Sequence, residues 1–253
     1  VLMIFARLGD GTLPAELMTG SSPVALLVLL ANFAFVTFGT VLAARLLQQR
    51  GLMDILGPPA LLWRQFRRVS LALVALGAVV LMLPPYDMGA PLTPNLSPGR
   101  WLAFLPLSLL AILIQTSAEE ILFRGFLQQS LAARFRSPVI WIGLPSALFA
   151  LGHYSGDLPG NTALMITAWA GLFGILSADL TARSGTLGPA IALHFFNNAI
   201  ALLVVALPDS LDGLALFTAP YDMSDAGLLQ AWLAVDLALM VVAWLAARLV
   251  LRR

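Results

Sequence analysis

The stretch WLAFLPLSLLAILIQTSAEEILFRG occupies residues 101–125 and joins a long apolar run to two adjacent glutamates and an arginine. A helix of ~20 predominantly apolar residues is long enough to cross a bilayer. Ionisable side chains at membrane depth are costly, face the interior of a helical bundle and usually mark function. The stretch therefore predicts a transmembrane helix that carries a polar site.

The whole chain has the composition of a polytopic membrane protein. Of its 253 residues, 60% are hydrophobic and 11% are charged, which excludes an ordinary soluble domain of this size. Hydropathy predicts an all-α membrane helical bundle that forms one domain over residues 1–253. About seven transmembrane helices are expected, at 23–47, 69–85, 101–123, 139–154, 163–180, 190–207 and 228–250.

Charges divide the connections between these spans into two sets. Arginines gather in alternate connections, at 45–68, 134–136 and 183, and at the C-terminus at 248–253. The other connections carry aspartates at positions 87, 157, 209, 212, 222 and 225, with Arg100 as their basic residue. The positive-inside rule therefore predicts an N-out/C-in orientation. Residues 50–68 mix apolar residues with arginines, which suits either an interfacial helix or a basic loop.

The choice of basic residues indicates the type of source organism, and the absence of cysteine limits the catalytic chemistry. All 14 basic residues are arginines, and the chain has no cysteine, so disulfides and thiolate catalysis are excluded. The arginine usage suggests a bacterial genome rich in G and C. We therefore expect an integral protein of the bacterial cytoplasmic membrane that contacts the lipid bilayer and has no nucleic-acid partner.

The charged residues of the third span divide into a pair and a single carboxylate. Glu120 and Arg124 are separated by one helical turn, so they lie on one face and can form an ion pair. Glu119 is rotated by about 100° from Glu120 and points elsewhere. A carboxyl group in a low-dielectric site without a compensating charge is suited to act as a general base.

The two histidines of the chain also fall within apolar spans. The connection at 134–138 is centred 17 residues from both Glu119 and His153, which predicts that these two residues lie at one depth in an antiparallel helix pair. Phe149 precedes His153 by one turn and is expected to pack beside the site.

His194 and Asn198 are likewise one turn apart and share a face, where both can donate hydrogen bonds to one point, as in an oxyanion hole. His194 is only about 8 Å along its helix from the expected start at Pro189. His194 and Glu119 lie at the same depth in the membrane if the third span continues through residues 124–136. The site then lies toward the cytoplasmic side.

The three groups together resemble the signature of a known family. The segments EEILFRG (119–125), FALGH (149–153) and LHFFNN (193–198) are similar, in order and character, to the motifs of the CPBP family of intramembrane proteases. That family includes the CAAX prenyl proteases and bacterial Abi-type relatives. The resemblance covers a core of about 100–200.

The resemblance implies a glutamate-dependent endopeptidase that cleaves a membrane-associated peptide or protein. By similarity, Glu119 activates a water molecule with the assistance of His153, and the water attacks a peptide carbonyl. His194 and Asn198 then stabilise the oxyanion. The residues expected to support the site or hold the peptide are Glu120, Arg124 and Phe149.

Other classes of function use similar residues. Two imidazoles and a carboxylate match a catalytic zinc site, although the chain has no HExxH motif and a metal-free site without a cofactor is favoured. A non-proteolytic assembly or immunity partner, in a stable complex with other membrane proteins, would retain the same fold. A proton-coupled transporter ranks last because the sequence shows no inverted repeat.

Overall fold

A computed structural model describes residues 12–83, 91–156, 158 and 160–252. The aspartates at 87 and 157, residue 253 and the last residues of the expected span 69–85 lie outside the described part. The main helices are α2 (Thr12–Thr19), α3 (Pro23–Ala31), α4 (Phe33–Gln48), α5 (Leu52–Leu56), α6 (Pro59–Leu81), α7 (Pro98–Glu120), α8 (Gln129–Ala132), α9 (Leu144–Gly152), α10 (Gly160–Ser184), α11 (Gly188–Ala199) and α12 (Ala226–Leu251). Three π-helical segments extend them, η1 (Ile121–Gln128), η2 (Val139–Gly143) and η3 (Ile200–Val204).

The predicted all-α membrane fold is confirmed. Among the described residues, four helical segments are long and apolar enough to cross a membrane, namely Pro23–Gln48, Pro98–Ala132, Asn161–Ser184 and Ala226–Leu251. The apolar helices Val139–Gly152 and Gly188–Val204 are shorter. Each of the seven expected spans falls on a helix. The number of seven crossings and the N-out/C-in orientation stay predictions, because the length of a helix does not fix its position in the membrane.

The segment 50–68 is neither a separate interfacial helix nor a simple loop. Helix α5 is a single short turn of Leu52–Leu56, and α6 begins at Pro59 and runs without a break through the arginines into the expected second span. Proline at the first helical position favours this start, because its missing N–H would have no intrahelical partner there.

The third span is longer than the apolar run that predicts it. Helix α7 passes into η1 and then α8, giving one helical segment of 35 residues, Pro98–Ala132. The expected continuation through 124–136 is thus helical as far as Ala132, and residues 133–136 belong to the turn that follows. The π-helical turns of η1 begin directly after Glu120, and such turns are frequent at functional sites.

Three very short strands adjoin the end of η3. Strand β2 (Val205–Ala206) pairs in parallel with β3 (Phe217–Thr218), and β1 (Thr93–Pro94) pairs antiparallel with β3. The expected sixth span, 190–207, is therefore wrong at its end, because the backbone becomes extended at Val205.

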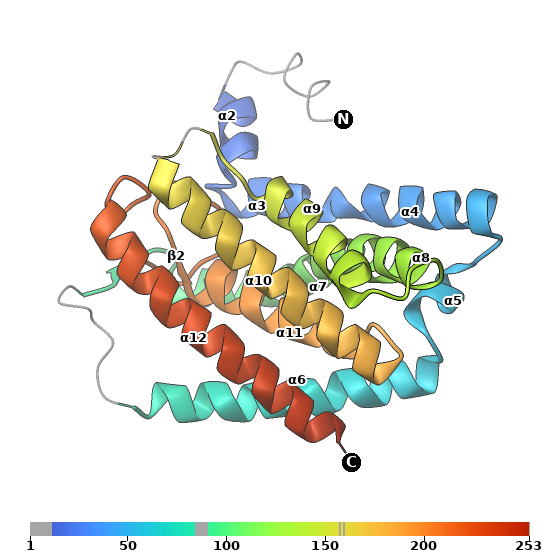
Figure 1. The fold of residues 1–253 in the computed structure, drawn as a ribbon. Coiled ribbons are helices and arrows are strands. Elements are labelled where there is room, and N and C mark those ends of the chain that lie inside the picture. The colour runs from blue at the N-terminus through green and yellow to red at the C-terminus, as the bar shows by residue number, and fades with distance from the viewer. Residues whose placement is uncertain (1–11, 84–90, 157, 159, 253) are drawn as a thin grey trace.

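Helix α11 lies at the centre of the bundle and contacts α6, α7, α10 and α12 (Figure 1). Its first seven residues, Gly188–His194, are all buried. The close approach to α6 requires glycine at position 188, since a Cβ there would lie 2.5 Å from the Leu62 carbonyl oxygen. The small residues at the start of α11 thus let α6 approach closely and fix the helix that carries His194.

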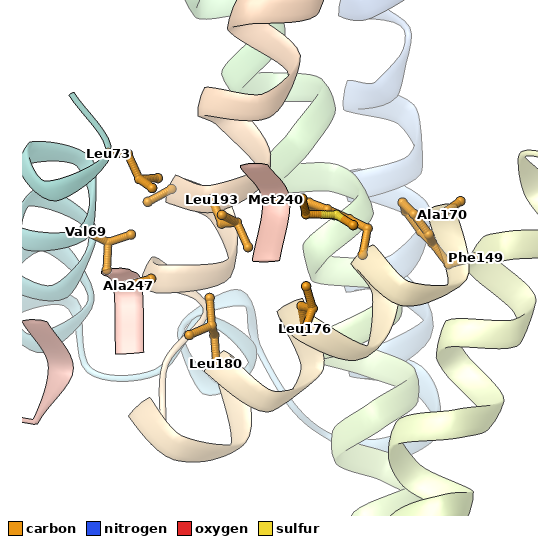
Figure 2. Close-up of a cluster of buried hydrophobic side chains, with 11 residues drawn as sticks. Val69, Leu73, Phe149, Ala170, Leu176, Leu180, Leu193, Met240 and Ala247 are labelled. Atoms are coloured by element: carbon orange, nitrogen blue, oxygen red, sulfur yellow. The ribbon is translucent and has the colours of Figure 1, made fainter. Parts of the chain in front are cut away.

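The largest apolar cluster joins α6, α9, α10, α11 and α12 (Figure 2). Phe149 of α9 and Phe173 of α10 belong to it, at 2% and 1% exposed area. Both rings also contact the His194 ring, at centroid distances of 6.0 and 4.7 Å. The core therefore extends without a break up to the polar residues.

The approach of α11 to α6 yields a stability prediction. We expect Gly188→Ala to lower the free energy of unfolding by about 1–3 kcal/mol, the usual range for overpacking. Thermal unfolding in a nonionic detergent measures the effect. Gly39→Ala in α4 is the matched control, because its Cβ would meet nothing within 4 Å; equal Tm values for the two variants would contradict the close approach.

Candidate functional site

Glu120 is the most deeply buried ionisable group of the site. Its side chain has no exposed area, and one oxygen, Oε1, accepts hydrogen bonds from Arg124 Nη1 at 3.1 Å and from His194 Nδ1 at 2.8 Å. The predicted pair between Glu120 and Arg124 is present. A buried carboxylate is costly unless it is paired and hydrogen-bonded. The two donors satisfy Oε1, whereas Oε2 has no hydrogen-bond partner among the described residues.

Arg124 connects the ion pair to the aromatic core. Its guanidinium is buried, donates to the Gly174 carbonyl of α10 at 3.3 Å and lies 4.7 Å from the centre of the Phe149 ring. A cation over an aromatic face is attracted by the ring quadrupole. Phe149 therefore supports the site through Arg124 as well as by packing.

His194 lies between the two glutamates. While its Nδ1 contacts Glu120, its Nε2 lies 3.5 Å from Glu119 Oε2. A carboxylate can only accept hydrogen bonds, so Nδ1 carries a hydrogen and the ring is oriented by Glu120. The sequence places His194 beside Asn198 but does not predict this bridging position.

The two glutamates of the cluster differ in their access to solvent. The Glu120 side chain has no exposed area, whereas 13% of the Glu119 side chain is exposed. The cation of the cluster, Arg124, is buried and pairs with Glu120. Glu119 therefore lies at the accessible end of the cluster.

His153 contacts Phe149 rather than the glutamates. It follows the last residue of α9, is exposed, and stacks on Phe149 at a centroid distance of 4.4 Å. Its Nδ1 lies 2.8 Å from the Phe149 carbonyl oxygen, so Nδ1 donates and Nε2 keeps a lone pair. Within the described residues it makes no ion pair or hydrogen bond with Glu119.

Asn198 is held by two other amides. Its Nδ2 donates to Gln115 Oε1 at 2.8 Å, and its Oδ1 accepts from Asn197 Nδ2 at 3.3 Å. Gln115 is buried and precedes Glu119 by one helical turn. The predicted site does not include Gln115. The sequence does hold a signal for it, because Gln115 is a polar residue in an apolar helix and lies one turn before Glu119, the candidate base.

The zinc alternative finds no ready set of ligands in the part of the chain that the structure describes. Among the described residues, no three His, Asp or Glu side chains are placed to hold one metal ion. His194 Nδ1 is hydrogen-bonded to Glu120, and its Nε2 lies 3.5 Å from Glu119 Oε2, whereas His153 stacks on Phe149 and contacts the Phe149 carbonyl. The donor set in this arrangement does not fit the zinc alternative.

Comparison with known proteins identifies the central part of the chain. Residues 101–200 match the family described as Type II CAAX prenyl endopeptidase Rce1-like. This segment is Rce1-like. It includes all seven predicted site residues, and the family resemblance predicted from the three motifs is confirmed.

A bacterial protein is similar over more of the chain. The uncharacterized protein YyaK of Bacillus subtilis (strain 168) is 26% identical over 192 residues, which cover 72% of this chain and 61% of YyaK. The match therefore leaves more than a third of YyaK without a counterpart here. No solved structure matches the chain.

The buried ion pair of the Rce1-like segment yields a prediction about stability. Arg124→Met leaves Glu120 buried without its cation, and we expect a loss of about 3–5 kcal/mol in the free energy of unfolding. Thermal unfolding of the purified protein measures it. Arg183→Met is the control, because Arg183 is 53% exposed and pairs with Asp179 at the surface, where a pair contributes at most about 1 kcal/mol. Similar losses for both variants would contradict the buried pair.

Proposed function

We propose that the chain is a glutamate-dependent intramembrane endopeptidase that cleaves a membrane-associated peptide or protein. The observation that supports this most strongly is the contact of His194 with both Glu119 and Glu120 within an Rce1-like segment. A base and a hydrogen-bond donor lie together at the accessible edge of a buried cluster. This is the pairing that attack by water on an amide requires.

In the proposed reaction, Glu119 accepts a proton from a water molecule. The water oxygen forms a bond to the peptide carbonyl carbon, and the electron pair of the C=O bond moves to the carbonyl oxygen. When this tetrahedral intermediate collapses, the C–N bond breaks, and Glu119 returns its proton to the leaving amine. The step consumes one water and yields a carboxylic acid and an amine, without a cofactor.

Two groups on α11 are proposed to stabilise the oxyanion. His194 donates from Nε2 once its ring carries both hydrogens, and its Nδ1–H is kept in place by Glu120. Asn198 has a second amide hydrogen beyond the one given to Gln115. Gln115 and Asn197 keep this amide from rotating, so the free hydrogen has one direction. Donors fixed in advance require no reorganisation during the reaction, which makes them effective.

The other predicted residues have supporting roles. His153 presents the lone pair of Nε2 at the exposed end of α9, where it can accept a hydrogen bond from the attacking water. Phe149 and Phe173 close the buried side of the site, and low dielectric strengthens the charge interactions of the cluster. Arg124 and Glu120 orient His194 rather than react.

The proposed location is the bacterial cytoplasmic membrane, with the site toward its cytoplasmic side. The similarity to a Bacillus protein supports a bacterial source. His194 is six residues from the start of α11 at Gly188, close to the connection at 185–187 that follows Arg183 in the last turn of α10. In the N-out/C-in orientation that connection faces the cytoplasm. The substrate, and any stable membrane-protein partner, would then approach from the membrane or the cytoplasm.

Glu119→Gln tests the proposed chemistry. The amide cannot accept a proton, so we expect cleavage to fall at least about 100-fold while the fold is retained. Cells lacking the native gene are complemented with wild type or variant, and new N-termini of membrane proteins are measured by mass spectrometry. Substrates should also co-purify with the variant.

Glu16→Gln is the matched control, because Glu16 is exposed and lies on α2, outside the site. It should produce the same new termini as the wild type. If Glu119→Gln also produces them, or restores the cellular role in full, the peptidase assignment is wrong and a binding role replaces it.

A further inference from the structure

Helices α10 and α12 run side by side in the same direction, so their last turns lie at one end of the bundle (Figure 1). Both belong to the helical segments that are long and apolar enough to cross a membrane. Each carries an arginine in its last turn, Arg183 on α10 and Arg248 on α12. A helix that spans the bilayer brings its last turn to the level of the lipid head groups. Both arginines are therefore expected at one membrane surface.

The carboxylate of Asp179 on α10 contacts both arginines. Its Oδ1 accepts a hydrogen bond from Arg183 Nε at 2.7 Å, and its Oδ2 accepts one from the Trp244 indole of α12 at 3.1 Å. Arg248 Nε lies 3.8 Å from the same Oδ2, and the Arg248 guanidinium lies 4.7 Å from the centre of the Trp244 ring. These contacts hold both guanidinium groups at the seam where α10 and α12 meet.

The seam carries more positive charge than Asp179 balances, because two guanidinium groups share this one carboxylate. Arg183 donates to it from Nε, so its Nη groups remain available, and its side chain is 53% exposed. Arg248 approaches the carboxylate at a distance beyond hydrogen bonding. Arg252 follows Arg248 by one turn and is exposed. Several guanidinium donors and an excess of positive charge thus lie together at head-group level.

A phosphodiester matches these donors in charge and in geometry. It carries one negative charge, and its oxygens accept the paired N–H groups of a guanidinium, which makes arginine well suited to phosphate. A glycerol head group adds hydroxyls and no charge, so the lipid stays anionic. The ammonium of a choline head group brings a further cation to a site that already has an excess. The seam therefore favours anionic over zwitterionic phospholipids.

Apolar side chains continue the seam from the arginines toward the middle of the membrane. On α10, Ile175 precedes Asp179 by one turn and is 44% exposed. On α12, Val241 precedes Arg248 by two turns and is partly buried. Residues one or two turns apart share a helix face, so these side chains lie on the same faces as the charged groups. An acyl chain can follow them while its phosphate stays at the arginines.

We propose that the seam between α10 and α12 binds an anionic phospholipid of the bilayer, with its phosphate on Arg183 and Arg248 and its chains along the apolar side chains that precede them. The site is separate from the polar cluster and does not depend on the proposed peptidase activity.

Native mass spectrometry of the full chain in a nonionic detergent tests the proposal by counting the lipids bound during a titration. Dioleoylphosphatidylglycerol and dioleoylphosphatidylcholine have the same chains, so only the head group differs. We expect the glycerol lipid to bind at least about fivefold more tightly, the effect of one arginine near an anionic membrane surface. An excess of inorganic phosphate should not displace it, because burial of the acyl chains contributes to binding.

Arg183→Gln and Arg248→Gln should each weaken phosphatidylglycerol binding about fivefold, because each removes one cation and its paired donors. Arg134→Gln is the matched control, since Arg134 is exposed in the turn after α8 and is expected on the same side of the membrane. It removes the same charge away from the seam and should bind like the wild type. Equal binding of the two lipids, unchanged binding in the seam variants, equal losses in all three variants, or displacement by inorganic phosphate would overturn the proposal.

Discussion

The carboxylate of Glu120 is withdrawn entirely from solvent, and a charge in that position costs several kcal/mol unless partners compensate it. Its partners come from separate elements, with Arg124 on η1 and His194 on α11, while Arg124 also holds the Gly174 carbonyl of α10. One buried charge therefore fixes the relative positions of three helices. The same contacts orient the His194 ring, so the requirement for pairing also shapes the site.

The surroundings of α11 show why the polar cluster is stable there. Its small first residues allow α6 to approach closely, and its polar residues face α7, where Gln115 and both glutamates lie. The neighbouring face borders a cavity between α6 and α12. One short helix thus separates a region where charges are paired from a cavity that is lined mainly by apolar side chains. This placement keeps water away from most of the cluster and leaves Glu119 as its accessible end.

Sequence reasoning predicts the parts of this arrangement that depend on local geometry. Hydropathy locates the helices, and a spacing of four residues predicts the pair of Glu120 with Arg124. The contact of His194 with both glutamates depends on how α7 and α11 cross, which residue spacing does not specify. Counting residues to the turn predicts equal depth for His153 and Glu119, which stays a prediction. The count assumes regular α-helices, and sequence spacing does not reveal the π-helical segments η1 and η2 that flank that turn. The contact of Gln115 with Asn198 and the cavity between α6 and α12 depend on how helices far apart in the sequence pack together, so they are recognised only in the folded structure.

The central claim is that Glu120 fixes the hydrogen of His194 on Nδ1 and directs Nε2 toward Glu119. The chain has two histidines, so nitrogen-15 NMR of histidine-labelled protein, with His153→Gln to remove the other signal, observes His194 alone. The account predicts that the neutral ring carries its hydrogen on Nδ1 and that Nε2 is bare. A neutral ring with its hydrogen on Nε2 and a bare Nδ1 would contradict it.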